Sequence, residues 1–336
     1  TRRDAPESSL TNLTFQNNDC RNTALYPNGS HRPCFMISGA GGAQYLNNTC
    51  TNTGGLASIH TESYYSDGLD VNASANITVD GLHLISQAVS PAIQIGKHAE
   101  NFTLRNITVE RVSDGHCMEF ATPLRGFSLD GALFSDCGKM GIQQMNLDPS
   151  GVHDDETLTL RNIAIHSAGA DLPSEGLRFR APMKGLVLDN FLVNGATSHG
   201  MGFDAGIEDS TLSNLTISNV AGHGIHLGGK TRNVNLTQTD VSHAGDDCIF
   251  LGQDVDATVD HQQTSLTHLT LVDCAGRGIA TAETGLVVRN LEIRDNTIDG
   301  VDGDGIGVVL TGSLSENVEL THNAVSDFGR RADGQI

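Results

Sequence analysis

The chain is poor in tryptophan, lysine and long apolar segments. Its 336 residues include no Trp and only 4% aromatic residues, which excludes a broad core packed with large rings. No apolar run is long enough to span a bilayer. Only four of its twenty basic residues are Lys, and forty acidic residues give a formal net charge of −20. Such a surface repels phosphates and anionic lipids, so we expect neither nucleic acid nor membrane partners.

The seven cysteines form no CxxC motif, which argues against a thiolate zinc site. An odd number leaves at least one thiol unpaired within a single chain. Spacing does not assign the pairs, although Cys20, Cys34 and Cys50 share the N-terminal segment and are candidates for a disulfide there.

A unit of about 24 residues repeats along the chain, and each copy ends in a similar five-residue phrase. The phrases read DGLDV, PAIQI, HCMEF, MGIQQ, EGLRF, HGMGF, HGIHL, DCIFL, RGIAT and DGIGV. Their central apolar residues are Leu69, Ile93, Met118, Ile142, Leu177, Met201, Ile225, Ile249, Ile279 and Ile306. Five of the nine spacings are 24 residues, one is 25, and the longer ones indicate inserted loops. A fixed period of this size is typical of a stacked solenoid.

A second repeated phrase, such as FTLRNITV or LVLDNFLV, alternates apolar and polar residues with the period of a β-strand. The sequence therefore predicts an all-β, right-handed parallel β-helix of about 10–12 rungs. We expect one domain over residues 1–336, with a less regular N-terminal segment at 1–60. The N-x-[ST] triplets suit turn positions followed by a β-branched strand residue better than glycosylation; they begin at Asn12, Asn28, Asn47, Asn72, Asn76, Asn101, Asn106, Asn214 and Asn235.

Stacking converts the repeat into a map of one surface. If the central apolar residue points inward, the residues two before, one after and three after it point outward. The position two before contains Glu175, His199, His223 and Asp247 in successive copies. The position one after contains Glu119, Gln143, Arg178, Gly202, His226, Phe250, Ala280 and Gly307 in successive copies. Polar chemistry is therefore expected to concentrate between the fifth and eighth phrases.

We predict a site on this face, walled by insertions at 146–157 and 252–265. The predicted catalytic residues are His226, His223, Asp204, His199 and Asp247. The predicted substrate-binding residues are Arg178, Arg180, Glu175, Gln143 and Glu119. Ligands in one straight file about 5 Å apart do not converge easily on one ion, so no metal ligand is assigned. The Asp-rich segments DVDATVD and DNTIDGVDGDG make calcium the one cofactor that the sequence suggests.

The 24-residue rungs resemble the pectate-lyase-like β-helix superfamily, which includes pectate lyases, polygalacturonases, alginate epimerases and phage tailspikes. The segment GFDAGIE at 202–208 is similar to the alginate epimerase phrase GFDPHE. Asp204 matches that family's aspartate, whereas Gly206 occupies its histidine position, so His226 of a neighbouring rung would supply the imidazole.

The resemblance implies a secreted or cell-surface enzyme that acts on a uronate polysaccharide such as alginate or pectate. It would remove the proton alpha to the carboxylate, as a lyase or an epimerase. Two alternatives remain open. One is a glycoside hydrolase in which Asp246 or Asp247 pairs with Glu175 or Asp204. The other is a non-catalytic, carbohydrate-binding shaft. Oligomeric state does not follow from the sequence.

Overall fold

A computed structural model describes residues 12–21, 35–37, 42–51, 59–61, 64–66, 69–71, 75–87, 91–95, 100–113, 115–121, 124–145, 157–168, 174–252, 259–282, 286–307 and 316–329. The chain falls into two compact units, Thr1–Leu172 and Pro173–Ile336. Within the described ranges all regular elements are strands. No helix among the described residues is long and apolar enough to cross a lipid bilayer. The single-domain organisation remains a prediction.

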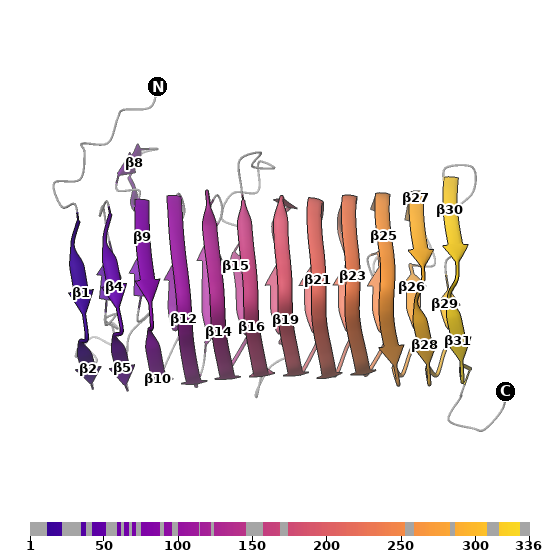
Figure 1. The fold of residues 1–336 in the computed structure, drawn as a ribbon, viewed down its shortest axis with the longest axis horizontal. Coiled ribbons are helices and arrows are strands. Elements are labelled where there is room, and N and C mark those ends of the chain that lie inside the picture. Colours follow the sequence, from indigo (N-terminus) through magenta and orange to yellow (C-terminus); the bar gives the residue numbers. More distant parts are fainter. Residues whose placement is uncertain are drawn as a thin grey trace. The chain divides into compact units, whose positions relative to one another are not determined.

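The first unit contains a long-strand sheet and a short-strand sheet, both parallel (Figure 1). The long-strand sheet contains β1 (Thr14–Gln16), β2 (Asp19–Arg21), β4 (Gln44–Leu46), β5 (Thr49–Thr51), β9 (Ala75–Asp80), β10 (His83–Gln87), β12 (Glu100–Val112), β14 (Phe127–Cys137) and β16 (Leu158–Ala168). The short-strand sheet contains β3 (Phe35–Ile37), β6 (Ile59–Thr61), β11 (Ile93–Ile95), β13 (Met118–Ala121) and β15 (Ile142–Met145).

The second unit repeats the same arrangement (Figure 1). Its long-strand sheet contains β18 (Met183–Lys184), β19 (Leu186–Ala196), β21 (Gly206–Val220), β23 (Lys230–Ala244), β25 (Val259–Val272), β27 (Leu286–Arg294), β28 (Thr297–Asp299), β30 (Glu316–Thr321) and β31 (Ala324–Ser326). Its short-strand sheet contains β17 (Leu177–Phe179), β20 (Met201–Phe203), β22 (Ile225–Leu227), β24 (Ile249–Leu251), β26 (Ile279–Thr281) and β29 (Ile306–Gly307).

The core of each unit is formed by the central apolar residues of the repeated phrases together with inward apolar residues of the long-strand sheet. From Ile93 to Ile279 every one of the central side chains is fully buried. Alternation along the strands places the intervening polar residues on the outer face, as the period of two requires. The sequence prediction of an all-β parallel solenoid is therefore confirmed.

One predicted rung is wrong. Leu69 begins β8 (Leu69–Val71), which pairs in antiparallel fashion with β7 (Tyr64–Ser66). The strand beneath Ile93 is instead β6, where Ile59 is the register partner of Ile93, and Phe35 of β3 pairs with Ile59. The phrase DGLDV has the local pattern of a rung, but local pattern does not select the pairing partner.

Turn asparagines explain the abundance of N-x-[ST] triplets. Six of them have a backbone φ between 50° and 58°: Asn12, Asn47, Asn76, Asn101, Asn106 and Asn214. Asn tolerates this left-handed region better than β-branched residues do. Side-chain bonds between rungs support the bends, such as Asn214 Nδ2 to Asp189 Oδ1 at 2.7 Å. These positions carry the structural role that the sequence predicts. For Asn235 the prediction is wrong, because it lies inside β23 and has no positive φ. Asn28 and Asn72 lie outside the described residues.

The two described disulfides lie at equivalent places of the repeat, one within each unit. Cys117 bonds Cys137 in the first unit and Cys248 bonds Cys274 in the second. In both pairs, one cysteine directly precedes a central apolar residue and the other lies five residues before the next one. Cys20 is free, so it does not bond Cys50, which is itself in a disulfide. Cys34 lies outside the described residues.

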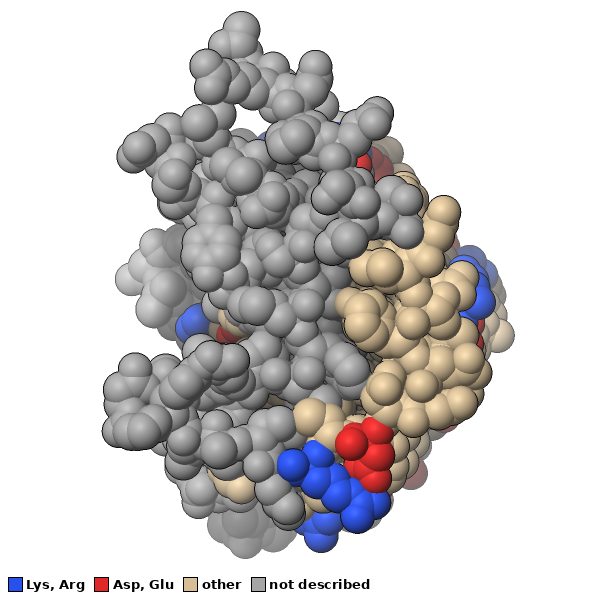
Figure 2. All heavy atoms as spheres, turned by 90° about the vertical axis from the view of Figure 1, so that its left-hand side faces the viewer, with Lys and Arg blue, Asp and Glu red and all other residues tan. Residues whose placement is uncertain are grey.

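Figure 2 views the end of the molecule that carries β1. Its described surface is mostly uncharged, and the charged side chains gather near its margins. The acidic excess of the chain is therefore not concentrated on the described part of this face.

Candidate functional site

The short-strand sheet of the second unit brings the predicted site residues into one column. Its register pairs Arg178 with Gly202, Gly202 with His226, and His226 with Phe250. Phe250 continues to Ala280, and Ala280 to Gly307. This column matches the sequence prediction for the position one after the central residue. Neighbouring members are about 4.8 Å apart, the spacing of paired strands.

Arg178 links two carboxyl groups. Its Nε donates to Asp204 Oδ2 at 2.9 Å, and its Nη2 lies 2.8 Å from the same oxygen. Its Nη1 lies 3.5 Å from Glu175 Oε1. The sequence placed Asp204 beside Arg180, but the contact is made by Arg178, whereas Arg180 is exposed. The arginine side chain is long enough for Arg178 to contact Asp204 diagonally on the neighbouring rung.

Glu175 is buried over a glycine. Its side chain is only 5% exposed, and its Oε2 has no hydrogen-bond partner among the described residues. A Cβ on Gly202 would collide with that oxygen, so the absence of a side chain at 202 makes room for the carboxyl. Burial raises the pKa of Glu175 to about 8; the Arg178 guanidinium opposes this rise and the Asp204 carboxylate adds to it. Glu175 is therefore mostly protonated at neutral pH.

Three histidines and a phenylalanine form a cluster of rings beside this group. The His199 and His223 rings stack with centroids 4.9 Å apart, and His223 stacks on Phe250 at 4.6 Å. His226 is tilted against His199 at 4.9 Å and against His223 at 5.5 Å. The structure therefore assembles the predicted histidines. Phe250 is a member that residue chemistry alone did not single out, although it occupies the predicted column.

Hydrogen bonds define the tautomers of two of these imidazoles. The backbone N–H of His223 donates to His199 Nδ1 at 3.0 Å, so a neutral His199 carries its proton on Nε2. His226 Nε2 lies 2.9 Å from the carbonyl oxygen of Gly252, which only accepts. A neutral His226 therefore carries its proton on Nε2 and has a lone pair on Nδ1.

Asp247 is held by Arg277 on the next rung. The Arg277 backbone N–H and Nε donate to Asp247 Oδ1 at 2.6 and 3.2 Å, and Nη2 donates to Oδ2 at 3.3 Å. The other side of this carboxylate faces His223 Nδ1, which lies 3.9 Å from Asp247 Oδ2 and 3.6 Å from Asp246 Oδ2. The repeat pattern predicts no role for Arg277, although this residue lies two positions before the central residue Ile279.

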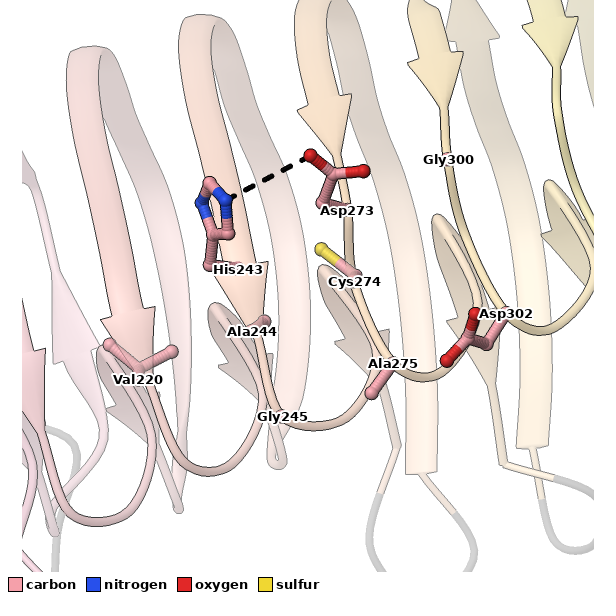
Figure 3. A pocket seen from close by; sticks show the side chains of 9 residues that line it. All are labelled: Val220, His243, Ala244, Gly245, Asp273, Cys274, Ala275, Gly300 and Asp302. Atoms are coloured by element: carbon pink, nitrogen blue, oxygen red, sulfur yellow. Dashed lines mark ion pairs between the residues drawn. The ribbon is translucent and has the colours of Figure 1, made fainter. Parts of the chain in front are cut away.

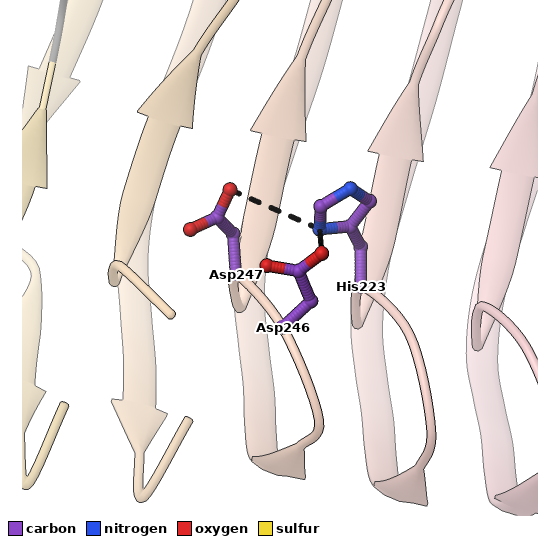
Figure 4. Close-up of side chains that lie close together, drawn as sticks. All are labelled: His223, Asp246 and Asp247. Carbon is purple, nitrogen blue, oxygen red and sulfur yellow. Dashed lines mark ion pairs between the residues drawn. The ribbon is translucent and has the colours of Figure 1, made fainter. Parts of the chain in front are cut away.

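Among the described residues, one group of side chains brings three potential metal ligands within 4.8 Å of one another: His223, Asp246 and Asp247 (Figure 4). The Asp-rich segment 295–305 forms no such group. Residues 254–258 of the other proposed calcium segment are outside the described ranges. Calcium therefore remains an expectation from sequence.

The predicted surface is less exposed than the sequence suggested. The outward residues Glu175, His223, His226 and Asp247 are each no more than 9% exposed. The described edges of the site are Arg178, Asp204, His199 and Asp246, which keep access to solvent. The predicted wall at 146–157 lies almost wholly outside the described residues. The prediction of a loop wall at 252–265 is partly wrong, because residues from 259 onward belong to the strand β25.

Glu119 and Gln143 lie in the first unit, where they are register partners. Both are buried. Glu119 Oε1 accepts a hydrogen bond from Gln94 Nε2 at 3.0 Å, and its Oε2 lies 3.8 Å from His116 Nε2. Burial raises the pKa of Glu119 above its ordinary value, and the bond from Gln94 opposes the rise. Their substrate-binding role remains a prediction.

A separate groove of about 370 Å³ lies along the bends of the second unit (Figure 3). His243, Asp273 and Asp302 line it, with His243 Nε2 3.8 Å from Asp273 Oδ2. Both members of this pair are more than half exposed. The groove shares no lining residue with the histidine cluster, and its pair offers a comparison for the more deeply buried His223 and Asp247.

Comparison with known proteins agrees with this architecture. The family described as "Right handed beta helix region" matches residues 151–325. No curated relative matches the sequence.

Three solved structures illustrate the likeness of fold. The catalytic unit of a thermostable GH87 alpha-1,3-glucanase from Streptomyces thermodiastaticus aligns with a TM-score of 0.57 at 12% identity, covering 96% of this chain and 65% of that one. A mutant of the periplasmic alginate epimerase AlgG gives 0.51 at 9%, covering 97% and 79%. A tailspike mutant of E. coli bacteriophage HK620, in complex with a hexasaccharide, gives 0.50 at 10%, covering 96% and 66%. The chain thus spans just under two thirds of the glucanase unit, and at these identities the likeness concerns the fold.

Proposed function

Because this chain belongs to the family of right-handed β-helix proteins, we propose that it is a secreted polysaccharide-active enzyme that removes the proton alpha to a uronate carboxylate, as a lyase or an epimerase. The observation that carries the proposal is the buried Glu175 carboxyl against the Arg178 guanidinium. The similar alginate epimerase and the sugar-bound tailspike support a polysaccharide as the ligand. The disulfides support secretion, since such bonds persist in oxidising surroundings.

The substrate carboxylate would bind Arg178. A guanidinium has five N–H groups, and its contacts with Asp204 and Glu175 leave two of them for a ligand. A protonated Glu175 would donate a further hydrogen bond to the same carboxylate. Exposed Arg180 adds positive charge nearby on the chain. Removal of the alpha proton makes the carboxylate enolate-like, so donors that are already in place stabilise the charge as it develops.

Two imidazoles would move the protons. His226 has its lone pair on Nδ1, which makes it the base. His199 carries a proton on Nε2 and is the proton donor, either to the opposite face of the sugar or to the leaving oxygen. His223 stacks on His199 and faces Asp247, so these two are positioning residues in this proposal. Return of a proton gives epimerisation, whereas expulsion of the neighbouring sugar gives cleavage.

A glycoside hydrolase is the second candidate, favoured by one observation. Glu175 and Asp204 both contact the Arg178 guanidinium, which places a proton-bearing carboxyl and a second carboxyl in one site. Hydrolases use such a pair, one as acid and the other as base or nucleophile.

Product analysis separates the candidates. The protein is incubated with alginate, pectate and neutral glycans, and unsaturated uronate, reducing ends and sugar stereochemistry are followed. New unsaturation indicates a lyase, and inverted stereochemistry without chain shortening indicates an epimerase. Reducing ends alone indicate a hydrolase, and binding without turnover indicates a shaft.

Variants then test the site. Glu175→Gln and Arg178→Lys are each expected to lower kcat/KM by about 100-fold or more, the loss typical of a removed charge-stabilising group. The matched control is Arg232→Gln. Arg232 Nη2 lies 2.7 Å from Glu208 Oε2 in an exposed pair that includes no member of the histidine cluster. Full activity in both site variants rejects the proposed site.

A further inference from the structure

His223, Asp246 and Asp247 converge on one point, although they come from two rungs. Their potential ligand atoms, one from each residue, all lie within 4.8 Å of one another (Figure 4). We propose that they bind one divalent first-row transition metal ion, such as Mn²⁺ or Zn²⁺. The sequence predicts no metal ligand, because side chains stacked in one straight column do not converge easily on one ion. Asp246 changes this, since the turn before β24 brings a second carboxylate to His223 from outside that file.

Contacts behind the ligands hold two of them in place. Asp247 is oriented by the backbone N–H and side chain of Arg277, all within 3.3 Å. The His223 ring lies between the rings of His199 and Phe250. Partners behind the ligands restrict their orientation and strengthen metal binding. Each carboxylate oxygen has two lone pairs, so Asp247 Oδ2 can accept from Arg277 and still face the ion.

Charge and access favour a cation here. Two carboxylates against one guanidinium leave one net negative charge beside the His223 imidazole. The side chains of His223 and Asp247 are each 5% exposed, so their interaction with an ion is weakly screened. Asp246 is 56% exposed and gives an ion a way in from solvent.

The ligand set selects the class of metal. One nitrogen and two carboxylates suit first-row transition ions, for which imidazole is a good ligand. Calcium prefers six to eight oxygens. The remaining positions on the ion would be filled by water or by a hydroxyl group of a bound glycan.

Metal titration of the whole chain tests the proposal. Chelator-treated protein is titrated with Mn²⁺, followed by electron paramagnetic resonance, and with Zn²⁺, followed by calorimetry. We expect one equivalent bound, weakened at least about tenfold by Asp246→Asn and by His223→Ala. The matched control, His243→Ala, alters a His–Asp contact of similar length at the exposed groove and should leave this affinity unchanged. Circular dichroism checks that each variant is folded.

Three outcomes overturn the proposal: no binding at millimolar metal, binding that both ligand variants leave intact, or Ca²⁺ displacing Mn²⁺ at equal concentration. Asp246→Asn addresses an exposed side chain, so it remains informative if His223→Ala does not fold. The readout is metal binding. The result therefore stands whether or not the protein turns over a polysaccharide.

Discussion

We expect the contribution of Glu175 to the free energy of unfolding to fall as the pH rises. In the unfolded chain this carboxyl has its ordinary pKa near 4.5, whereas in the folded protein burial raises the pKa to about 8. Between these values the folded state holds a proton that the unfolded state has released. The contribution is therefore fully present below the unfolded pKa and is lost as the pH rises through the folded one.

The magnitude follows from the size of the shift. Each unit of pKa difference corresponds to about 1.4 kcal/mol, so the free energy of unfolding should fall by about that much per pH unit between roughly pH 5 and 8. The whole shift amounts to roughly 3 to 6 kcal/mol. Glu175→Gln has no proton to lose, so this part of the pH dependence should disappear. The variant should resemble the wild type at pH 5 and exceed its stability at pH 8.5.

Urea unfolding followed by circular dichroism at several pH values measures the difference between the two proteins. Glu119 also has a raised pKa, but it is present in both, so its contribution cancels. The control is Glu292→Gln: hydrogen bonds from Arg294 and Ser265 lower the pKa of Glu292, so this variant should not flatten the alkaline side. Parallel curves for the wild type and Glu175→Gln would refute the assignment of a buried, protonated carboxyl.

Three further changes test the packing around the site and the turns. Gly202→Ala should push the Glu175 carboxyl toward solvent, since the new Cβ would meet its Oε2; the same urea curves should then show a weaker pH dependence, and an unchanged curve would contradict the close approach. The double variant Cys248→Ser, Cys274→Ser should lower the free energy of unfolding by about 3 kcal/mol, measured with urea, because it opens a closed loop spanning 26 residues; a loss below about 1 kcal/mol would count against this role. Asn214→Ala should lower the free energy of unfolding by about 1 kcal/mol or more, because alanine is strained at a φ of 53°. Asn214→Gly should lower it by less, since glycine adopts this φ readily. Thermal unfolding measures both losses, and the opposite order would contradict the role of the left-handed backbone.

Much of this architecture could be predicted from spacing. Residues 24 positions apart become neighbours because each turn of the solenoid stacks in register, so Arg178, Gly202 and His226 align as the repeat predicts. The burial of the central apolar residues follows from the period of two along each strand. The turn asparagines could be predicted as well, because few residues tolerate a left-handed backbone.

Only the tertiary structure determined which strands pair, which side chains meet diagonally and which carboxyl keeps its proton. Leu69 carries the phrase of a rung yet pairs with Ser66 in a local hairpin, and Ile59 instead is the register partner of Ile93, a choice that the local pattern does not reveal. Arg178, not Arg180, holds Asp204, since the two side chains have the same length and only the direction that each takes determines a diagonal contact. Glu175 holds its proton because Gly202 admits its carboxyl into a space away from water, and desolvation cannot be deduced from a residue's own identity. The repeat thus determined which residues become neighbours, and packing in three dimensions determined their charge and contacts.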